Sequence, residues 1–507
     1  MSALRNIKTA FISVWQKDDL EKIIEAINKL DIQIYSTGGT ADFIEKMNCP
    51  VTRVENITGY PSILGGRVKT LHPKIFGGIL ARRHLETDIR DMNNYKIPTF
   101  DLVVVDLYPF GETLASGAAD EEIIEKIDIG GISLIRAAAK NFNDVLIIPS
   151  RDHYNELFNI LDQKGGQTYF EERRLLAGEA FRVSSLYDTA IHNYFLNKET
   201  ASFSISFPKG KKLRYGENPH QNAYYYSSSE HPFNQIHGKE ISYNNLLDID
   251  AARGLISEFE ETTFAILKHN NACGLASREN LKQAWLDALA GDPVSAFGGV
   301  LVTNRKVDKE SAEEINKLFF EVIIAPSYHE DALLILKEKK NRIILVNNNI
   351  EAPKHVIKSA AGGLLVQDRD MKTESESDLK VVTKLAPGEN QISDLIFANK
   401  IVKHTKSNAI VLARNKQLIG SGVGQTSRID ALKHAIEKAR SAGIGIEGSA
   451  MASDAFFPFA DSVEIANKAS VSSVIQPGGS VRDQDSIDFC NKNKMIMVFT
   501  GVRHFKH

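Results

Sequence analysis

The sequence predicts an α/β protein with more than one domain, and three observations lead to this prediction. The chain has 507 residues, more than the roughly 100–200 residues of an ordinary domain. Short apolar runs alternate with amphipathic stretches in its N-terminal third, and a series of short motifs recurs further along. We therefore expect an open, mostly parallel sheet at the N-terminus, followed by two related α/β halves.

The N-terminal third has the clearest strand pattern. Residues 8–14, KTAFISV, predict a buried strand, and the apolar residues between 20 and 30 fall on one face of a helix. Three more apolar runs have the character of parallel strands: DIQIYS (31–36), DLVVVDL (101–107) and DVLIIPS (144–150). In such a sheet, ligands bind at the carboxyl ends of the strands.

Composition narrows the possible partners and locations. A net charge of −3 argues against a broad basic surface for nucleic acid. The three cysteines are far apart and form no C-x-x-C motif, which favours a reducing compartment. No apolar run reaches the roughly 18 residues of a membrane span, and the N-terminus lacks an apolar signal core. We expect a cytoplasmic protein that binds neither nucleic acid nor membranes.

Three glycine-containing segments are candidate sites. STGGT (36–40) joins a strand to a helix, so its backbone N–H groups can approach a phosphate, although a plain tight turn explains the motif equally well. GGRVKTLHPKIFGG (65–78) carries basic side chains between two glycine pairs, which favours an anion-binding loop. In IDIGGISLIRAAAKN (127–141), Asp128 precedes Gly130-Gly131, and the alanine-rich helix favours an inward-facing Lys140.

With SVxxK (13–17) and VVxxLYPF (104–110), these segments resemble the inosine monophosphate (IMP) cyclohydrolase half of a bifunctional purine-biosynthesis family. The resemblance implies a methylglyoxal-synthase-like, Rossmann-type domain over residues 1–199. It places Lys69, Tyr108, Asp128 and Lys140 around the closing ring. It assigns the nucleotide's phosphate and ribose to Lys17, Ser36, Thr37, Gly38, Gly39, Thr40, Arg67 and Thr70. Ser13, Gly130 and Gly131 are further expected substrate-binding residues.

Three positions depart from the pattern of that family. Trp15-Gln16 replaces Ser-Asp, Asp106 replaces Asn, and Phe76 stands where His is usual. Asp106 matters most, because a carboxylate repels a phosphorylated ligand unless it is protonated or paired. An alternative therefore stays open: formyltransferase activity only, with the N-terminal domain an inactive or regulatory nucleotide-binding module.

The C-terminal part contains two Lys-His pairs. Lys268-His269 follows the apolar run FAIL, and Lys403-His404 precedes another apolar run. KHNNACG, DPVSAFGG and EVIIAP are followed in similar order by KHTKSN, SDAFFPFAD and VIQPGGS. We expect an internal duplication with a reactive cleft between the copies and a break near the polar connector 371–379.

Two such halves suggest a deaminase-like fold, but the zinc ligands of deaminases are missing. That chemistry needs H-x-E and P-C-x-x-C motifs, and neither occurs after residue 200. We expect no bound metal.

These blocks, with LRYGENPHQ (213–221), GVGQTSRID (422–430) and FTGVRHFKH (499–507), resemble the formyltransferase half of the same family. That half acts on phosphoribosyl-aminoimidazole-carboxamide (AICAR). The resemblance implies a domain over residues 200–507 with two cytidine-deaminase-like subdomains, and a homodimer with sites at the subunit interface. No cofactor is expected to be permanently bound, and 10-formyltetrahydrofolate is the implied co-substrate.

The expected reaction moves a formyl group to the 5-amino group of AICAR, giving formyl-AICAR, which the other half closes to IMP. His269 suits proton transfer, Lys268 suits the oxyanion or the leaving nitrogen, and Asn408 suits the formyl oxygen. The resemblance assigns the nucleotide to Arg214, Tyr215, Asn245, Glu321, Arg428, Arg503 and Phe505. It assigns the folate side to Phe456, Pro458, Phe459 and Asp461. Gly298, Gly479 and Ser480 are further candidates for substrate binding, although Gly-Gly-Ser also fits an ordinary turn.

Overall fold

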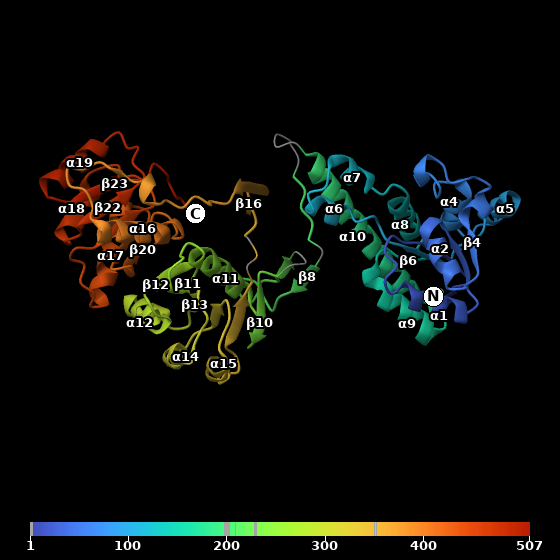
Figure 1. Ribbon diagram of the computed structural model, residues 1–507, viewed down its shortest axis with the longest axis horizontal. Helices are drawn as coiled ribbons and strands as arrows, with labels where there is room; N and C mark the ends of the chain where they lie inside the picture. Colours follow the sequence, from blue (N-terminus) through green and yellow to red (C-terminus); the bar gives the residue numbers. More distant parts are fainter. Residues whose placement is uncertain (1–3, 197–202, 208, 228–230, 349, 351) are drawn as a thin grey trace. The chain divides into compact units, whose positions relative to one another are not determined.

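The computed structural model describes residues 4–196, 203–207, 209–227, 231–348, 350 and 352–507. The chain divides into two compact units, Met1–Pro208 and Lys209–His507, each with its own sheet (Figure 1). The predicted boundary near residue 200 lies outside the described residues. The expected mixed α/β class is confirmed.

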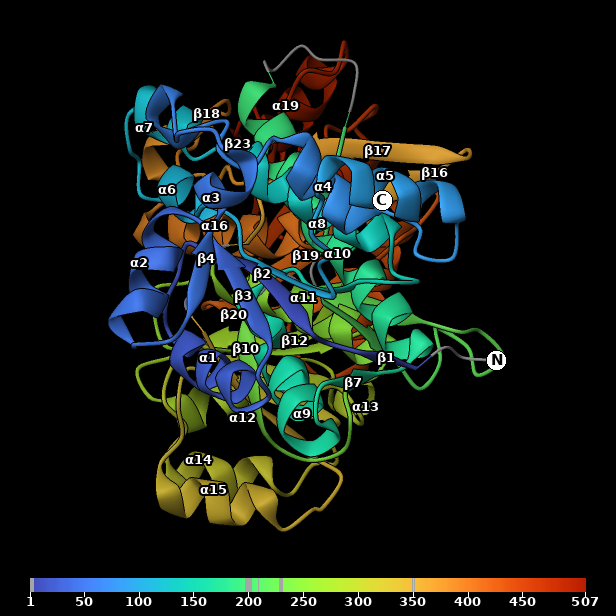
Figure 2. The ribbon, with the colours of Figure 1, turned by 90° about the vertical axis from the view of Figure 1, so that its right-hand side faces the viewer.

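The N-terminal unit is built on a five-stranded parallel sheet with helices on both sides. Figure 2 shows its strands β2, β3 and β4 side by side. The sheet order is β4 (Val51–Arg53), β3 (Gln33–Ser36), β2 (Thr9–Ser13), β5 (Leu102–Val105) and β6 (Leu146–Ile148). The strands are short, and β5 and β6 are wholly apolar and buried because both faces of the sheet are covered there.

The helices of this unit follow the strands in α/β alternation. They are α1 (Leu20–Lys29), α2 (Gly38–Lys46), α3 (Val54–Thr58), α4 (Pro73–Leu80), α5 (Glu86–Tyr95), α6 (Phe110–Ala115), α7 (Asp120–Glu125), α8 (Gly130–Lys140), α9 (Tyr154–Lys164) and α10 (Phe170–Phe195). Short 3-10 turns span Leu64–Gly66 and Arg151–His153, and β1 (Arg5–Asn6) pairs with β7 (Gln167–Thr168). The predicted amphipathic helix is α1, which buries Leu20, Ile23, Ile24 and Ile27.

The C-terminal unit is built on one twelve-stranded sheet. Its order is β10 (Phe233–His237), β15 (Ile343–Asn347), β14 (Val322–Ala325), β13 (Val300–Thr303), β11 (Thr263–Lys268), β12 (Asn271–Ser277), β20 (Gln417–Gly422), β19 (Ile410–Arg414), β21 (Ala450–Ser453), β22 (Ser473–Gln476), β23 (Ile496–Phe499) and β18 (Lys380–Val381). Two ribbons stand apart from it: β8 (Lys209–Lys212) with β9 (Tyr224–Ser227), and β16 (His355–Ala360) with β17 (Gly363–Asp368).

This sheet contains the same arrangement twice. In each half an antiparallel hairpin, β11–β12 or β19–β20, is followed by three strands that run parallel to one another, and an antiparallel edge strand closes the half. The halves join where β12 and β20 pair antiparallel, with Ala276 opposite Gln417. The duplication predicted from the motif order is therefore present in the topology.

Helices cover both faces of the large sheet. One face packs on α11 (Tyr243–Ile256) and α16 (Glu389–Lys403) in a core that both halves share. On the other face, separate cores lie under the helices of each half. These helices are α12 (Leu281–Gly291), α13 (Pro293–Ala296), α14 (Lys309–Ile315) and α15 (Glu330–Lys337), then α17 (Arg428–Ser441), α18 (Asp461–Lys468) and α19 (Asp483–Lys492). A 3-10 turn spans Glu376–Asp378.

The two Lys-His pairs do not occupy corresponding places in the two halves. Lys268-His269 lies at the β11–β12 turn, whereas Lys403-His404 ends α16. The counterpart of the first turn is Asn415-Lys416 in the β19–β20 hairpin, and both turns have two successive residues with positive φ. The Ile-x-Pro motifs do correspond, because they follow β14 and β22. The recurrence of a Lys-His dipeptide therefore does not show that its two copies lie in the same kind of element.

Candidate functional site

The strand order of the N-terminal sheet reverses at β2. The chain moves from β2 to β3 on one side and later returns to β5 on the other, so the loops after β2 and β5 diverge. Such a switch point at the carboxyl ends of parallel strands is where α/β sheets bind ligands. Ser13, Ser36 and Asp106 each end or follow one of these strands.

The STGGT segment forms the turn into α2, and its hydroxyls have different roles. Ser36 Oγ donates to Ile12 O at 2.7 Å, and Thr40 Oγ1 donates to Val14 O at 2.9 Å, so both hold the sheet together. Thr37 Oγ1 is buried without a hydrogen-bond partner among the described residues. A buried hydroxyl left unpaired at a helix N-terminus is the group of this segment best suited to a ligand.

Four segments meet at the start of α2 and α8. A Cβ added at Gly38 would lie 2.7 Å from Lys69 Nζ, and one added at Gly130 would lie 2.8 Å from Thr70 Oγ1. Gly131 N donates to Asp128 Oδ1 at 2.6 Å. The absent side chains of the glycines therefore let a lysine, a threonine and a carboxylate approach two helix N-termini.

Asp128 and Tyr108 have perturbed acidities in this cluster. Burial raises the pKa of Asp128, although backbone N–H groups of Gly131, Tyr108 and Gly130 and the charge of Lys69 oppose the rise. Burial, with the nearby Asp128 carboxylate, also raises the pKa of Tyr108. A buried carboxylate beside a lysine is a typical environment for a group that exchanges protons.

The departures at Trp15 and Asp106 form one local structure. The Asp106 carboxylate accepts the backbone N–H groups of Trp15 and Gln16, the second at 3.0 Å. The Trp15 ring packs edge-to-face against Tyr108 with centroids 5.0 Å apart. The Asp106 carboxylate is therefore hydrogen-bonded to backbone donors of its own chain, while burial raises its pKa.

Lys17 lies beside this structure. Its ammonium donates to the carbonyl oxygens of Val14 and Trp15. Burial lowers its pKa, an effect that Asp106 opposes and Lys69 reinforces.

Several predicted members do not join the cluster. Lys140 is exposed at the far end of α8, about 15 Å along the helix from Gly130, so the prediction that it faces inward beside Asp128 is wrong within one chain. Arg67 is more than half exposed and pairs with Glu125. In the same loop, His72 caps α4 and Lys74 Nζ donates to Ile57 O. The basic loop therefore contributes mainly Lys69 and Thr70 to the cluster at the start of α2 and α8.

In the C-terminal unit, the predicted residues gather along one edge of the large sheet. The antiparallel β12–β20 junction reverses the second half relative to the first. The amino ends of β13 and β14 therefore share an edge with the carboxyl ends of β21, β22 and β23. First-half residues on this edge are Lys268, His269, Gly298 and Glu321, and second-half residues are Asn408, Phe456, Gly479 and Arg503.

The Lys268-His269 turn is held from two sides. Lys268 Nζ donates to Phe297 O at 2.7 Å, and Asn270 N donates to Asp248 Oδ1 at 2.6 Å. Asn271 Oδ1 accepts from Lys406 N at 2.9 Å, which ties this turn to the loop before β19. In that loop Asn408 Nδ2 donates to Gln425 O at 3.0 Å. The sheet thus places the Lys-His turn and Asn408 about 14 Å apart, three strand spacings, along one edge.

A cationic and aromatic cluster occupies the second-half end of this edge. Arg428 Nη2 donates to Asp454 Oδ1 at 3.0 Å, and the Phe505 ring lies 4.4 Å from Arg503 Cζ and 5.7 Å from Arg428 Cζ. Asp454 was not among the predicted residues, although it lies inside the SDAFFPF motif and is fully buried. Two guanidinium groups around one ring suit a phosphorylated, planar ligand.

The remaining predicted residues have local partners or exposed positions. Arg214 stacks on Tyr215, with its Cζ 4.6 Å from the ring. The Asn245 side-chain oxygen accepts from Ser242 in the cap of α11. Pro458 and Phe459 are exposed, Phe456 is half-buried and Asp461 begins α18. Glu321 pairs with Lys239, a partner that no sequence signal predicted.

Gly479 and Ser480 are a correction. Their backbone N–H groups both donate to Asp483 Oδ2, at 2.7 and 3.1 Å. The prediction that they offer free donors to a substrate is wrong in this structure, because the Asp483 carboxylate occupies both N–H groups.

Among the described residues, no group of three or more His, Cys, Asp or Glu side chains is arranged to hold a metal ion. No helix in this part of the chain is long and apolar enough to cross a membrane.

Comparisons with known proteins agree along the whole chain. A family model described as AICARFT/IMPCHase bienzyme matches residues 138–438, and one described as MGS-like domain matches residues 19–133. Proteins named bifunctional purine biosynthesis protein PurH are similar to this chain. The one from Bacteroides thetaiotaomicron is 61% identical and covers 100% of both chains. The one from Caldicellulosiruptor saccharolyticus is 45% identical over 99% of this chain and 100% of its own.

A solved structure titled "Crystal structure of ForH" is 34% identical over 38% of this chain and 100% of its own, with a TM-score of 0.33. The full-length relatives and the family models cover both structural units. The chain therefore belongs to the AICARFT/IMPCHase bienzyme family, with an MGS-like N-terminal domain.

Proposed function

We propose that the C-terminal unit formylates AICAR with 10-formyltetrahydrofolate and that the N-terminal unit closes formyl-AICAR to IMP. These are two successive reactions of purine biosynthesis, the process that the names of the full-length relatives give. The observation that carries the proposal is that each sheet collects an acid–base group and a lysine at one edge: Asp128 with Lys69, and His269 with Lys268.

The formyl transfer needs a base and oxyanion stabilisation, because the 5-amino nitrogen of AICAR is a weak nucleophile. That nitrogen attacks the formyl carbon, the new C–N bond forms, and the bond to N10 of the folate breaks. His269 accepts the proton of the amine. Lys268 stabilises the tetrahedral oxyanion, and a proton reaches the departing N10. Asn408 lies too far along the edge from Lys268 of its own chain to bind the same oxygen, so its contact with the formyl oxygen belongs to a site that a second chain completes.

Ring closure uses the N-terminal cluster at the start of α2 and α8. The carboxamide nitrogen attacks the formyl carbon, and the former formyl oxygen leaves as water. Lys69 and the N-terminus of α2 stabilise the developing oxyanion. Asp128, whose pKa burial raises, and Tyr108 move protons to and from the ring. The unpaired Thr37 hydroxyl and Thr70 bind the phosphate or ribose.

The formyltransferase acts as a homodimer that builds each site from two chains. Within one chain, Glu321 before β14 and Arg503 after β23 lie eight strand spacings apart, about 38 Å along the sheet. A small nucleotide cannot bridge that distance, so residues from the two ends of the edge act together only across a subunit interface. The expected location is the cytoplasm.

Separating the two units tests the proposal. We would express residues 1–208 and 209–507 as two proteins and assay each one for its own reaction. The first should convert formyl-AICAR to IMP without folate, and the second should formylate AICAR but accumulate formyl-AICAR. A folded N-terminal piece that forms no IMP would instead support the reading in which this unit only binds nucleotides.

A further inference from the structure

The C-terminal tail carries a buried histidine that the reaction does not use. Among residues 501–507, His504 is 2% exposed, while its neighbours Arg503 and Phe505 face outward. Arg503 and Phe505 belong to the proposed nucleotide site, so the position of His504 governs the side chains on either side of it.

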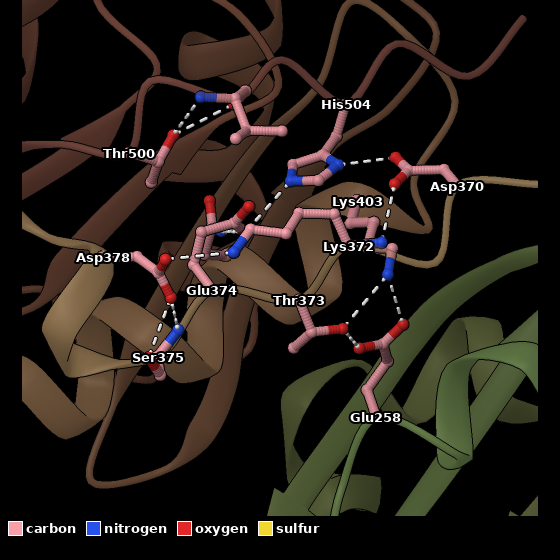
Figure 3. A network of polar contacts seen from close by, with 12 residues as sticks. Glu258, Asp370, Lys372, Thr373, Glu374, Ser375, Asp378, Lys403, Thr500 and His504 are labelled. Atoms are coloured by element: carbon pink, nitrogen blue, oxygen red, sulfur yellow. Dashed lines mark hydrogen bonds and ion pairs between the residues drawn. The ribbon is translucent and has the colours of Figure 1, made fainter.

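Figure 3 shows His504 between two carboxylates, Asp370 and Glu374. Both belong to the segment between β17 and β18, residues 369–379, which is called the connector from here on. Its Nδ1 lies 2.6 Å from Asp370 Oδ2, and its Nε2 lies 3.0 Å from Glu374 Oε2. A neutral imidazole has only one N–H, so two carboxylates at these distances require the doubly protonated, charged ring. Glu374 is itself buried and accepts from Asn399 of α16 at 2.8 Å.

The backbone of His504 points at the same nucleotide site. Its N–H donates to Asp454 O at 3.1 Å, and the Asp454 carboxylate holds Arg428. The next residues are tied as well, because Lys506 N donates to Ser407 Oγ at 3.1 Å and Ser407 N donates to Lys506 O. The tail therefore connects Arg428, Asn408 and the connector through a single extended segment.

We propose that charged His504 is a positioning residue that anchors the C-terminal tail to the connector and so holds Arg503 and Phe505 against the nucleotide. The inference rests on the proposed function, since it assigns AICAR to this end of the sheet. Without the ring charge, the two carboxylates face each other and keep only neutral donors among the described residues, Asn399 Nδ2 on Glu374 and the backbone N–H of Lys372 on Asp370, which releases the tail.

The charge state should persist through the physiological range. Burial works to lower the pKa of His504, but hydrogen bonds to Asp370 and Glu374 outweigh it and raise the pKa to about 9. A raised histidine pKa means that the anchor is complete below the ordinary value of 6.5 and is lost as the pH rises through about 9. The other charged groups around His504 and its two carboxylates are already paired. Lys403 pairs with Glu258, which also contacts His404, and Lys372 pairs with Asp378.

The test measures the dissociation constant of AICAR and the two KM values of formylation for the full-length His504→Gln protein. We expect affinity for AICAR to fall about tenfold, with the KM for 10-formyltetrahydrofolate nearly unchanged. The wild-type KM for AICAR should rise above pH 9, and that rise should be absent in the variant. His434→Gln on the exposed face of α17 is the matched control and should change nothing.

Two further variants separate positioning from folding. Asp370→Asn alters a half-exposed partner, should fold, and should weaken AICAR binding in the same direction. His504→Gln combined with Glu374→Gln removes the unpaired buried charge, so thermal stability should recover while AICAR affinity stays low. Recovery of both properties would mean that His504 has only a structural role.

Folded His504→Gln protein with wild-type affinity for AICAR would overturn the inference and leave the proposed function intact. Wild-type protein that binds AICAR without formylating it would contradict the proposed function, and the binding comparison would still decide the role of His504. Wild-type protein that does not bind AICAR would contradict both the proposed function and the role proposed for His504.

Discussion

At the scale of single residues, the N-terminal site depends on glycines, whose lack of a side chain leaves room for neighbouring groups. Gly38 has φ +51°, and a Cβ there would meet the Lys69 ammonium. Gly130 and Gly131 likewise leave room for Thr70 and Asp128. Substitutions at these glycines therefore test the site through the position of its neighbours.

Gly38→Ala should lower the cyclohydrolase kcat/KM at least about tenfold because it displaces Lys69 from the start of α2. Formylation should be unaffected. The control is Gly117→Ala, which also has positive φ (+72°) but has nothing within 4 Å of the added methyl group. Equal losses in the two variants would show that backbone strain, not Lys69, is responsible.

Lys268→Ala and His269→Ala should each abolish formylation while ring closure by the N-terminal unit continues. His269 has positive φ (+52°), so part of any loss comes from the backbone. Asn415→Ala, at the corresponding turn of the second half with φ +50°, measures that part alone. Unimpaired formylation in either of the first two variants would contradict the proposed roles.

At the scale of secondary-structure elements, a buried cluster joins the two halves of the C-terminal unit. Glu258, which follows α11, accepts from Lys403 at 2.8 Å and lies 2.9 Å from His404, both at the end of α16 (Figure 3 shows Glu258 with Lys403). Lys403-His404 is thus a link between elements. That assignment explains why the pair recurs without repeating the environment of Lys268-His269.

Glu258→Gln should destabilise the C-terminal unit by about 3 kcal/mol, because it leaves the Lys403 ammonium buried and unpaired. The side chains of Glu258 and Lys403 are 9% and 5% exposed. Glu261→Gln breaks the exposed pair with Lys416 and should cost less than about 1 kcal/mol. Urea unfolding of both variants measures the difference, and equal losses would contradict this account.

The same cluster predicts a pH dependence. Burial tends to raise the pKa of Glu258, but His404, Lys403 and Thr373 outweigh it and lower the pKa to about 2. A lowered carboxylate pKa stabilises the fold above the ordinary value of 4.5, and this contribution is lost as the pH falls toward 2. The stability gap between wild type and Glu258→Gln should therefore narrow below pH 4.5. A constant gap would indicate that Glu258 is not charged in the fold.

At the scale of the whole molecule, the formyltransferase sites should be shared between two chains. Lys268→Ala and Arg503→Ala proteins should each be inactive alone. When subunits exchange, half of the dimers are mixed and one of their two sites is intact, so about a quarter of wild-type activity should return. No recovery from subunits that demonstrably exchange would mean that each site belongs to one chain.

Much of this organisation could be predicted from sequence. The apolar runs identified β2, β3, β5 and β6, and the motif order identified the duplication. The predictions that failed concern where a side chain or a backbone N–H group points. Lys140 belongs to a correctly predicted helix but lies at its exposed end, and the donors of Gly479 and Ser480 are occupied by Asp483. Sequence spacing does not show which end of a helix faces a site, or which side chain of the same chain binds a backbone donor.

The sequence by itself determined the α/β class, the family and the segments that carry its chemistry, because apolar periodicity and motif order are local properties. Only the tertiary structure decided which of those residues meet. The antiparallel junction of β12 and β20 turns one half over, so opposite strand ends of the two copies share an edge. The Asp106 carboxylate likewise binds a backbone donor 90 positions away in the sequence. His504 binds connector carboxylates 134 and 130 positions away. Such contacts arise from packing between distant segments, and no local pattern encodes them.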